Sequence, residues 1–363
     1  MGKKLNTTSS HIVVLPVWLG GGSDITPTAS AYFAIVATAL PIFQFSIFGA
    51  GMLRSSGNMV VPSVMSVVMM SLDVVFNFFL IFPTRPVQLF GAEVTIPGMG
   101  LGVVGAAIGT VSAELVAASI TMYILCFRSK ELSLRIDTGR FLPTWGVVKR
   151  ALHISLPMGL QQTIMCSAYV MTTIIIAPLG TFAIAANSFG VIVESLCYMP
   201  GYGIADAATT LVGQSIGAGR HELMKRFAWL SVGLGVTVMA VMGVVMYVGA
   251  PVAMAMMTPA EEVRRLGVEV LRIEAFAEPM FAAAIVSYGV FVGAAKTLVP
   301  SIMNLISIWG VRISLAALLA PSMGLRGVWI AMCIELCFRG FIFLVKLKFW
   351  NIQTSCNHYG KDQ

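Results

Sequence analysis

Residues 61–82 read VPSVMSVVMMSLDVVFNFFLIF, an apolar run in which Asp73 is the one charged residue. A helix needs about 20 apolar residues to cross the hydrocarbon core of a bilayer, and this run is long enough. The rest of the 363-residue chain is similar, with 57% hydrophobic and 11% charged residues and a mean hydropathy of +0.87. Soluble domains carry about 25% charged residues. The composition therefore excludes a soluble, disordered or fibrous protein and predicts an all-α polytopic membrane protein.

Nine stretches are long and apolar enough to span a membrane: 29–52, 61–82, 98–127, 154–176, 182–212, 227–250, 268–293, 300–321 and 325–350. Most Lys and Arg residues of the connecting loops fall on one side of this arrangement. Because cytoplasmic loops collect Lys and Arg, the basic linker 128–153 and the C-terminal tail 351–363 are predicted to be cytoplasmic. The same rule explains the net charge of +7 without a nucleic-acid partner.

The start of the 61–82 run recurs at a constant offset of 238 residues. Val61-Pro62-Ser63-x-Met65 matches Val299-Pro300-Ser301-x-Met303, and Pro41 matches Pro279. The second copy has three further spans upstream of the matching region, and their counterparts would precede residue 1. A complete chain would have 6+6 spans running in the same direction, which is the parallel-repeat plan of many secondary transporters. We therefore predict a twelve-helix, two-lobe fold that lacks its first three helices.

This plan divides the chain into five parts. They are an N-terminal stub that is the remnant of a third helix, an incomplete N-lobe with helices 4–6, the cytoplasmic linker, a complete C-lobe with helices 7–12, and the cytoplasmic tail. The predicted ranges are 1–28, 29–127, 128–153, 154–350 and 351–363.

Three segments resemble motifs of the multidrug and toxic compound extrusion (MATE) family. Leu53-Arg54-Ser55-Ser56-Gly57-Asn58 is similar to its L-R-G-x-G-[DN] turn, Leu211–Gly219 (LVGQSIGAG) to its L-V-G-Q-x-x-G-A-G segment, and Gly324–Trp329 (GLRGVW) to the start of its last helix. The resemblance covers about residues 29–350. It implies twelve helices in two lobes around a central cavity, exporting cationic or amphipathic compounds in exchange for Na⁺ or H⁺. The family's first-helix carboxylate has no counterpart in this sequence.

Acidic residues inside spans are candidate coupling residues, because inserting one costs at least about 2.5–3.5 kcal/mol. Glu274 and Glu278 are spaced to share one helix face, with Pro279 directly after them. Two such carboxylates, about 6 Å apart, repel each other in a low dielectric, so they should hold a proton or a Na⁺ ion. Glu194 and Asp206 lie in the neighbouring span. These four residues are the predicted cation-coupling site.

Amide and acidic side chains elsewhere in the spans are predicted to bind substrate. At the family's seventh-helix acid site this chain has two glutamines. The predicted substrate-binding residues are Gln161, Gln162, Asn187, Asp73 and Asn77, and each could instead connect helices through polar contacts. Glu335 and Arg339, four residues apart, are predicted to form a structural ion pair. No catalytic residue, metal site or cofactor is predicted beyond the coupling ion, and the scattered cysteines contain no C-x-x-C pair.

The predicted function is secondary active efflux of multiple drugs or cationic compounds by Na⁺ or H⁺ antiport through alternating access. The protein is expected to act as a monomer in the bilayer of the plasma membrane. Alternatives are a lipid-linked oligosaccharide flippase of the same broad fold and a non-transporting truncated fragment. Deep inside the spans lie seven acids but three bases, Arg272, Arg312 and Arg339, which favours cationic cargo. A membrane enzyme acting on diphosphates is disfavoured because no loop has two Asp within five residues.

Overall fold

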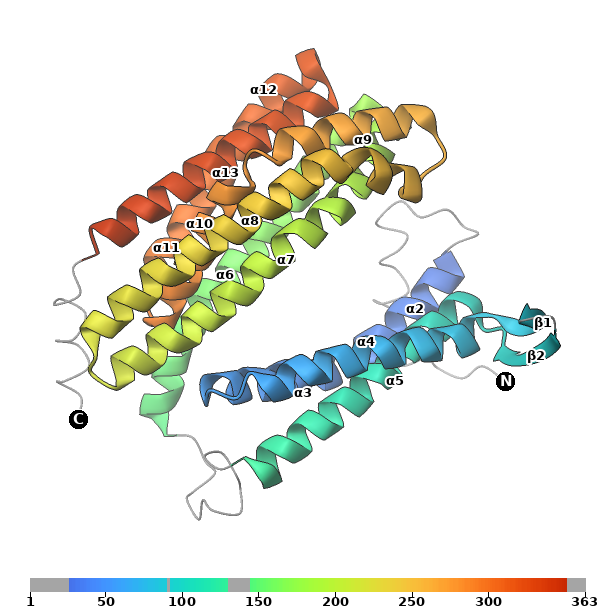
Figure 1. Cartoon of the computed structure of the whole chain (residues 1–363), viewed down its shortest axis with the longest axis horizontal. Coiled ribbons are helices and arrows are strands. Elements are labelled where there is room, and N and C mark those ends of the chain that lie inside the picture. Colours follow the sequence, from blue (N-terminus) through green and yellow to red (C-terminus); the bar gives the residue numbers. More distant parts are fainter. Residues whose placement is uncertain (1–25, 90–91, 130–143, 351–363) are drawn as a thin grey trace, which may run out of the picture. The chain divides into compact units, whose positions relative to one another are not determined.

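The computed structural model describes residues 26–89, 92–129 and 144–350 (Figure 1). The chain forms two compact units, Met1–Phe141 and Leu142–Gln363. The boundary between them falls inside the range predicted as a linker. The stub up to residue 25, residues 130–143 of the linker and the tail 351–363 lie outside the described residues.

The first unit contains a bent helix pair, two further helices and a β-hairpin. Its elements are α2 (Thr26–Thr38), α3 (Leu40–Ser55), α4 (Val60–Ile81), β1 (Pro83–Leu89), β2 (Ala92–Met99), α5 (Gly102–Tyr123) and the π-helical turn η1 (Ile124–Arg128). Helices α4 and α5 pack closely because Gly105 and Gly109 of α5 lie against Leu80 and Asn77 of α4. Small residues of this kind allow membrane helices to approach each other.

The hairpin was not predicted from the sequence. Strands β1 and β2 pair antiparallel, with Arg85 opposite Ile96 and Val87 opposite Val94. Pro83 ends α4, since proline cannot continue a helix interior, and the β-branched residues that follow favour strands. The next helix therefore begins at Gly102, four residues later than the start of the predicted 98–127 span.

The second unit is a bundle built around α10. Its elements are α6 (Trp145–Ile176), η2 (Ala177–Leu179), α7 (Thr181–Gly217), α8 (His221–Met257), α9 (Glu261–Glu274), α10 (Glu278–Gly293), α11 (Leu298–Leu305), the π-helical η3 (Ile306–Ile313), α12 (Ser314–Met323) and α13 (Leu325–Lys348). Helix α10 packs against α7, α8 and α13, and most of its residues are buried. The core of this unit therefore surrounds the helix that begins at Glu278.

Small residues set the contact between α7 and α10. A Cβ atom at Gly289 of α10 would lie 2.6 Å from the carbonyl oxygen of Ala205, and Thr209 donates a 2.8 Å hydrogen bond to the carbonyl oxygen of Gly289. The two backbones touch because position 289 has no side chain. This close approach places Asp206, the neighbour of Ala205, beside α10.

Seven described helices are long and apolar enough to cross a membrane, and the bent pairs α2–α3 and α9–α10 raise the number to as many as nine. Each corresponds to one of the nine stretches predicted from the sequence. The prediction of an all-α polytopic membrane fold is confirmed, with the hairpin as an addition to it.

The internal repeat also accounts for the two bends. Helix α3 covers residues 40–55 and α10 covers residues 278–293, so both helices begin and end at positions related by the offset of 238. Each has proline as its second residue, Pro41 or Pro279. Proline fits the first turn of a helix but not its interior, so the chain must break before it. The bends measure 45° in the first pair and 59° in the second.

Candidate functional site

Glu274 and Glu278 flank the break between α9 and α10. Glu274 is the last residue of α9 and Glu278 is the first of α10, and the amide of Ala277 donates a 2.8 Å hydrogen bond to the carbonyl oxygen of Glu274. The sequence prediction placed both residues on one face of a continuous helix. That part of the prediction is wrong, because Pro279 forces the helix to restart.

Both carboxylates are buried, each residue being 1% exposed. None of their four carboxylate oxygens has a hydrogen-bond partner among the described residues. Buried polar groups in proteins are nearly always hydrogen-bonded, and a buried charge without a partner is costly. The break therefore carries two acids for which the described protein supplies no donor.

Helix α8 closes one side of this break. A Cβ atom at Gly243 would lie 2.8 Å from the carbonyl oxygen of Ala275 and 3.3 Å from Cβ of Glu278, so α8 packs directly on the turn. The Glu274 carboxylate also lies within electrostatic range of Glu194 and Arg312. The predicted coupling residues Glu194, Glu274 and Glu278 thus belong to one buried group of charges.

Glu194 of α7 faces a cavity of about 300 Å³, here called the Glu194 cavity. It is bordered by α6, α7, η3 and α13, and its lining includes Tyr169, Asn187, Glu194, Trp329, Arg312 and Arg339. A second cavity of about 330 Å³, the Asp206 cavity, is lined by residues that include Gln161, Gln162, Asp206, Tyr288 and Asn304. Met165, Tyr202, Phe281 and Arg339 line both cavities. The two therefore adjoin each other inside the second unit.

Two of the predicted substrate residues have protein partners. The Oε1 atom of Gln161 accepts a 3.1 Å hydrogen bond from the Tyr288 hydroxyl, and Oδ1 of Asn187 accepts one of 3.1 Å from Nε1 of Trp329. Gln162 is exposed and lines the Asp206 cavity. Gln161 and Asn187 therefore hold aromatic side chains of the cavity walls, whereas Gln162 and Asp206 face the cavity.

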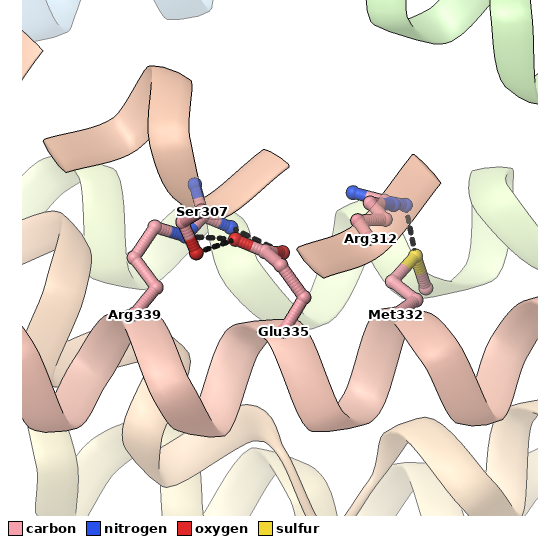
Figure 2. A network of polar contacts seen from close by, with 5 residues as sticks. All are labelled: Ser307, Arg312, Met332, Glu335 and Arg339. Carbon is pink, nitrogen blue, oxygen red and sulfur yellow. Dashed lines mark hydrogen bonds and ion pairs between the residues drawn. The ribbon is translucent and has the colours of Figure 1, made fainter. Parts of the chain in front are cut away.

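A polar network lies between η3 and α13, beside the Glu194 cavity (Figure 2). The Nε atom of Arg339 lies 3.0 Å from Oε1 of Glu335, and the Ser307 hydroxyl donates a 2.6 Å hydrogen bond to the same oxygen. The predicted ion pair between residues 335 and 339 is confirmed. Arg312 contacts the sulfur of Met332.

Asp73 and Asn77 belong to the first unit. The hydroxyl of Thr110 donates a 2.7 Å hydrogen bond to Asp73, and the buried Oδ1 of Asn77 has no partner among the described residues. Seven of the nine predicted site residues thus lie in the second unit, around the break and the two cavities, and these two make their contacts within the first.

The aromatic residues of the cavity walls are not among the site residues predicted from the sequence. A signal for two of them was present, because Glu194, Tyr198, Tyr202 and Asp206 follow one another at every fourth position of α7. Such a row lies along one side of a helix. Trp329 and Tyr288 carried no comparable signal, since their partners lie more than a hundred residues away in the chain.

Comparison with known proteins places this geometry in a family. The MatE family model matches residues 157–318, which include α7 to α11, the break and most of the lining of both cavities. The probable multidrug resistance protein NorM of Thermotoga maritima is 27% identical over 327 residues, covering 89% of this chain and 67% of that protein. Both findings support the chain as a MATE family transporter. It is therefore a multi-span membrane transporter and not an enzyme, and the resemblance seen in its sequence is confirmed.

Other MATE relatives match parts of the chain. The NorM protein of Xylella fastidiosa (strain Temecula1) is 29% identical over 238 residues, covering 65% of this chain and 50% of that protein. The chain thus spans between half and two thirds of the length of these relatives.

Solved structures of similar fold include a MOP superfamily transporter from Pyrococcus furiosus, which is described by a binding pocket of reverse polarity. Its TM-score is 0.82 at 19% identity, covering 94% of this chain and 74% of that one. A MATE protein in its bent conformation has a TM-score of 0.81 at 19% identity, covering 98% and 75%. These structural likenesses show the fold.

Proposed function

We propose that this chain acts in secondary active efflux, moving cationic or amphipathic compounds out of the cell in exchange for Na⁺ or H⁺ by alternating access. It does so as a monomer in the plasma membrane. The relatives named as probable multidrug resistance proteins support efflux of multiple compounds. The observation that carries the exchange mechanism is the pair Glu274 and Glu278, whose buried carboxylate oxygens have no donor among the described residues.

A proton or a hard cation is the partner that such a pair requires. Two adjacent ionised carboxylates repel each other, and both lose hydration in the bundle core. Protonation removes the charge, and Na⁺ provides a hard cation suited to oxygen ligands. A broken helix in mid-bundle is where transporters place coupling-ion sites. Glu194 and Asp206 extend this proposed coupling site towards the two cavities.

The substrate is proposed to occupy the adjoining Glu194 and Asp206 cavities. Their walls combine aromatic side chains with acids and amides, which suits amphipathic cations. Gln162 and Asp206 contact it directly, and Gln161 and Asn187 position Tyr288 and Trp329. Asp73 and Asn77 offer a further polar position in the first unit.

The distribution of basic residues supports the orientation. The start of α6, the turn between α7 and α8, the turn between α10 and α11 and the end of α13 lie at one end of the second unit (Figure 1). These segments carry Lys149, Arg220, Lys296 and Lys348. The positive-inside rule assigns that end to the cytoplasm. The C-terminus is accordingly proposed to be cytoplasmic.

Ethidium efflux from proteoliposomes containing the purified chain tests the proposal. An inward Na⁺ or H⁺ gradient should accelerate efflux, and dissipating that gradient should stop it. Glu274→Gln and Glu278→Gln should each abolish the gradient-driven part. Glu262→Gln, on the exposed surface of the same helix α9, is the matched control and should transport normally.

Each opposing outcome contradicts a specific part of the proposal. ATP-dependent efflux that ignores both gradients would refute antiport. Normal efflux in both glutamine variants would remove the pair from the coupling site. Scrambling of a lipid-linked oligosaccharide without ethidium efflux would favour a flippase, and inactivity in both assays would identify the chain as a non-transporting fragment.

A further inference from the structure

Arg312 lies within the candidate span Leu298–Met323, where a charged side chain is costly. Its guanidinium contacts the sulfur of Met332, a neutral and weak acceptor (Figure 2). Among the described residues, no carboxylate forms an ion pair with it. Arg312 is therefore a cation in the membrane bundle that has no direct ion-pair partner among the described residues.

Arg339, the neighbouring arginine, differs in this respect. Glu335 neutralises it at 3.0 Å, and Ser307 fixes that carboxylate. Both arginines line the Glu194 cavity, but only the positive charge of Arg339 is balanced within the wall. Arg312 also belongs to η3, a π-helical segment, and such segments occur frequently at functional sites.

Glu194 provides the opposite charge in the same cavity. Glu194 is 7% exposed, and its carboxylate forms neither a hydrogen bond nor an ion pair with another described residue. Arg312 and Glu194 influence each other electrostatically without forming a direct ion pair. The cavity wall thus presents one unpaired positive and one unpaired negative group at separate positions.

Aromatic side chains fill much of the remaining wall. Tyr169, Tyr198, Tyr202, Phe281 and Trp329 surround the cavity of about 300 Å³. Flat apolar bodies pack against such walls, and ammonium groups are attracted to the ring faces. A ligand that satisfies every part of this cavity needs an aromatic body, an ammonium group and an anionic group.

We propose that the Glu194 cavity selects zwitterionic aromatic compounds, with Arg312 binding the carboxylate of the ligand and Glu194 binding its ammonium group. This inference rests on the proposed function for the placement of substrate in the cavity, and it goes beyond cationic cargo by assigning an anion subsite. Arg312 suits this role because its planar guanidinium can donate two parallel hydrogen bonds to a carboxylate. Ligand binding would replace the weak contact with Met332.

Two dansyl compounds that differ by one carboxylate test the subsite. Nε-dansyl-lysine carries an ammonium and a carboxylate group, and dansylcadaverine is the same molecule without the carboxylate. Their fluorescence reports binding to the purified full chain in lipid nanodiscs. Arg312→Gln should weaken binding of dansyl-lysine by about tenfold or more, the usual effect of losing a hydrogen bond between charged groups. Binding of dansylcadaverine should be unchanged or tighter, because a repelling cation is removed.

Three further variants keep the outcome interpretable. Arg312→Lys should retain part of the preference for dansyl-lysine. Glu194→Gln should weaken the binding of both probes. Arg272→Gln, at an exposed arginine, should alter the binding of neither probe. An equal effect of Arg312→Gln on the binding of both probes, or no effect on either, overturns the anion subsite.

Failure of the proposed efflux is a separate result. Gradient-driven efflux can be absent while the difference between the probes persists, and the difference can be absent while efflux persists.

Discussion

Gly243 of α8 lies against Glu278 of α10, so that a Cβ atom added at position 243 would approach Cβ of Glu278 to 3.3 Å and the carbonyl oxygen of Ala275 to 2.8 Å. The second distance is too short for a relaxed contact. The turn between α9 and α10 therefore depends on the absence of a side chain on the neighbouring helix.

Gly243→Ala should destabilise the second unit and displace this turn. Overpacking of this kind costs about 1–3 kcal/mol, and the melting temperature in detergent micelles should fall accordingly. Gly233→Ala on the same helix is the matched control, because nothing lies within 4 Å of a Cβ atom there. Equal melting temperatures for the two variants would show that the turn does not depend on Gly243.

The ion pair of Glu335 and Arg339 should contribute much more to stability than the exposed pair of Glu269 and Arg326. The latter is shorter, at 2.6 Å against 3.0 Å, but its side chains are 34% and 52% exposed. Glu335→Gln leaves the buried Arg339 charge uncompensated, which costs about 3–5 kcal/mol. Arg326→Gln breaks a solvated pair, worth about 0–1 kcal/mol.

Unfolding of each variant in mixed micelles measures this difference. The double variant Glu335→Gln/Arg339→Gln should recover part of the loss, because it leaves no unpaired charge. A larger loss for Arg326→Gln than for Glu335→Gln would contradict the ranking by burial.

Removing an acid at the break should not destabilise the protein, in contrast to Glu335→Gln. Glu274 has no hydrogen-bond partner to lose among the described residues, so Glu274→Met replaces an unsatisfied group with an apolar one of similar size. We expect an unchanged or higher melting temperature. In the unmodified chain, the coupling ion should raise the melting temperature because it binds the folded state.

The measurement compares melting temperatures in sodium and choline salts and at two pH values. Glu274→Met should lose the stabilisation by the ion, whereas Glu262→Met, exposed on the same helix, should keep it. A drop in stability as large as that of Glu335→Gln would reveal a structural partner for Glu274 and remove the argument for coupling.

The membrane spans could be predicted because span length and apolar composition are properties of a local stretch of sequence. The bends were harder to predict. Pro279 and its repeat counterpart Pro41 are visible in the sequence, but apolar composition continues across both breaks and predicts one span for each bent pair. The hairpin lay outside this reasoning because its first strand, Pro83–Leu89, falls between two predicted spans.

The acidic residues of the candidate site could be predicted from the sequence. The side chains that contact its charged groups could not. Buried acids in apolar stretches are conspicuous, and Glu194, Glu274 and Glu278 were selected for that reason. Whether an acid has a partner depends on packing between distant segments. Ser307 reaches Glu335 from 28 residues away, and no pattern in the sequence connects Arg312 with Met332. The unpaired state of Arg312 could therefore be recognised only in the structure.

Asn187 should act through Trp329 and not by touching substrate. Nε1 of Trp329 donates a 3.1 Å hydrogen bond to Oδ1 of Asn187, and the indole is 1% exposed. Asn187→Ala leaves this buried donor unpaired, which costs about 1–3 kcal/mol of stability, and it frees the ring to move. Tryptophan fluorescence and thermal unfolding should both change. Binding of the two dansyl probes should weaken equally, because the cavity wall packs against the aromatic body that both probes share. Ser195→Ala, on the same helix but outside the lining of both cavities and hydrogen-bonded to the carbonyl oxygen of Ile192, should change none of these. Weaker probe binding in Asn187→Ala with unchanged stability and fluorescence would instead make Asn187 a direct substrate ligand.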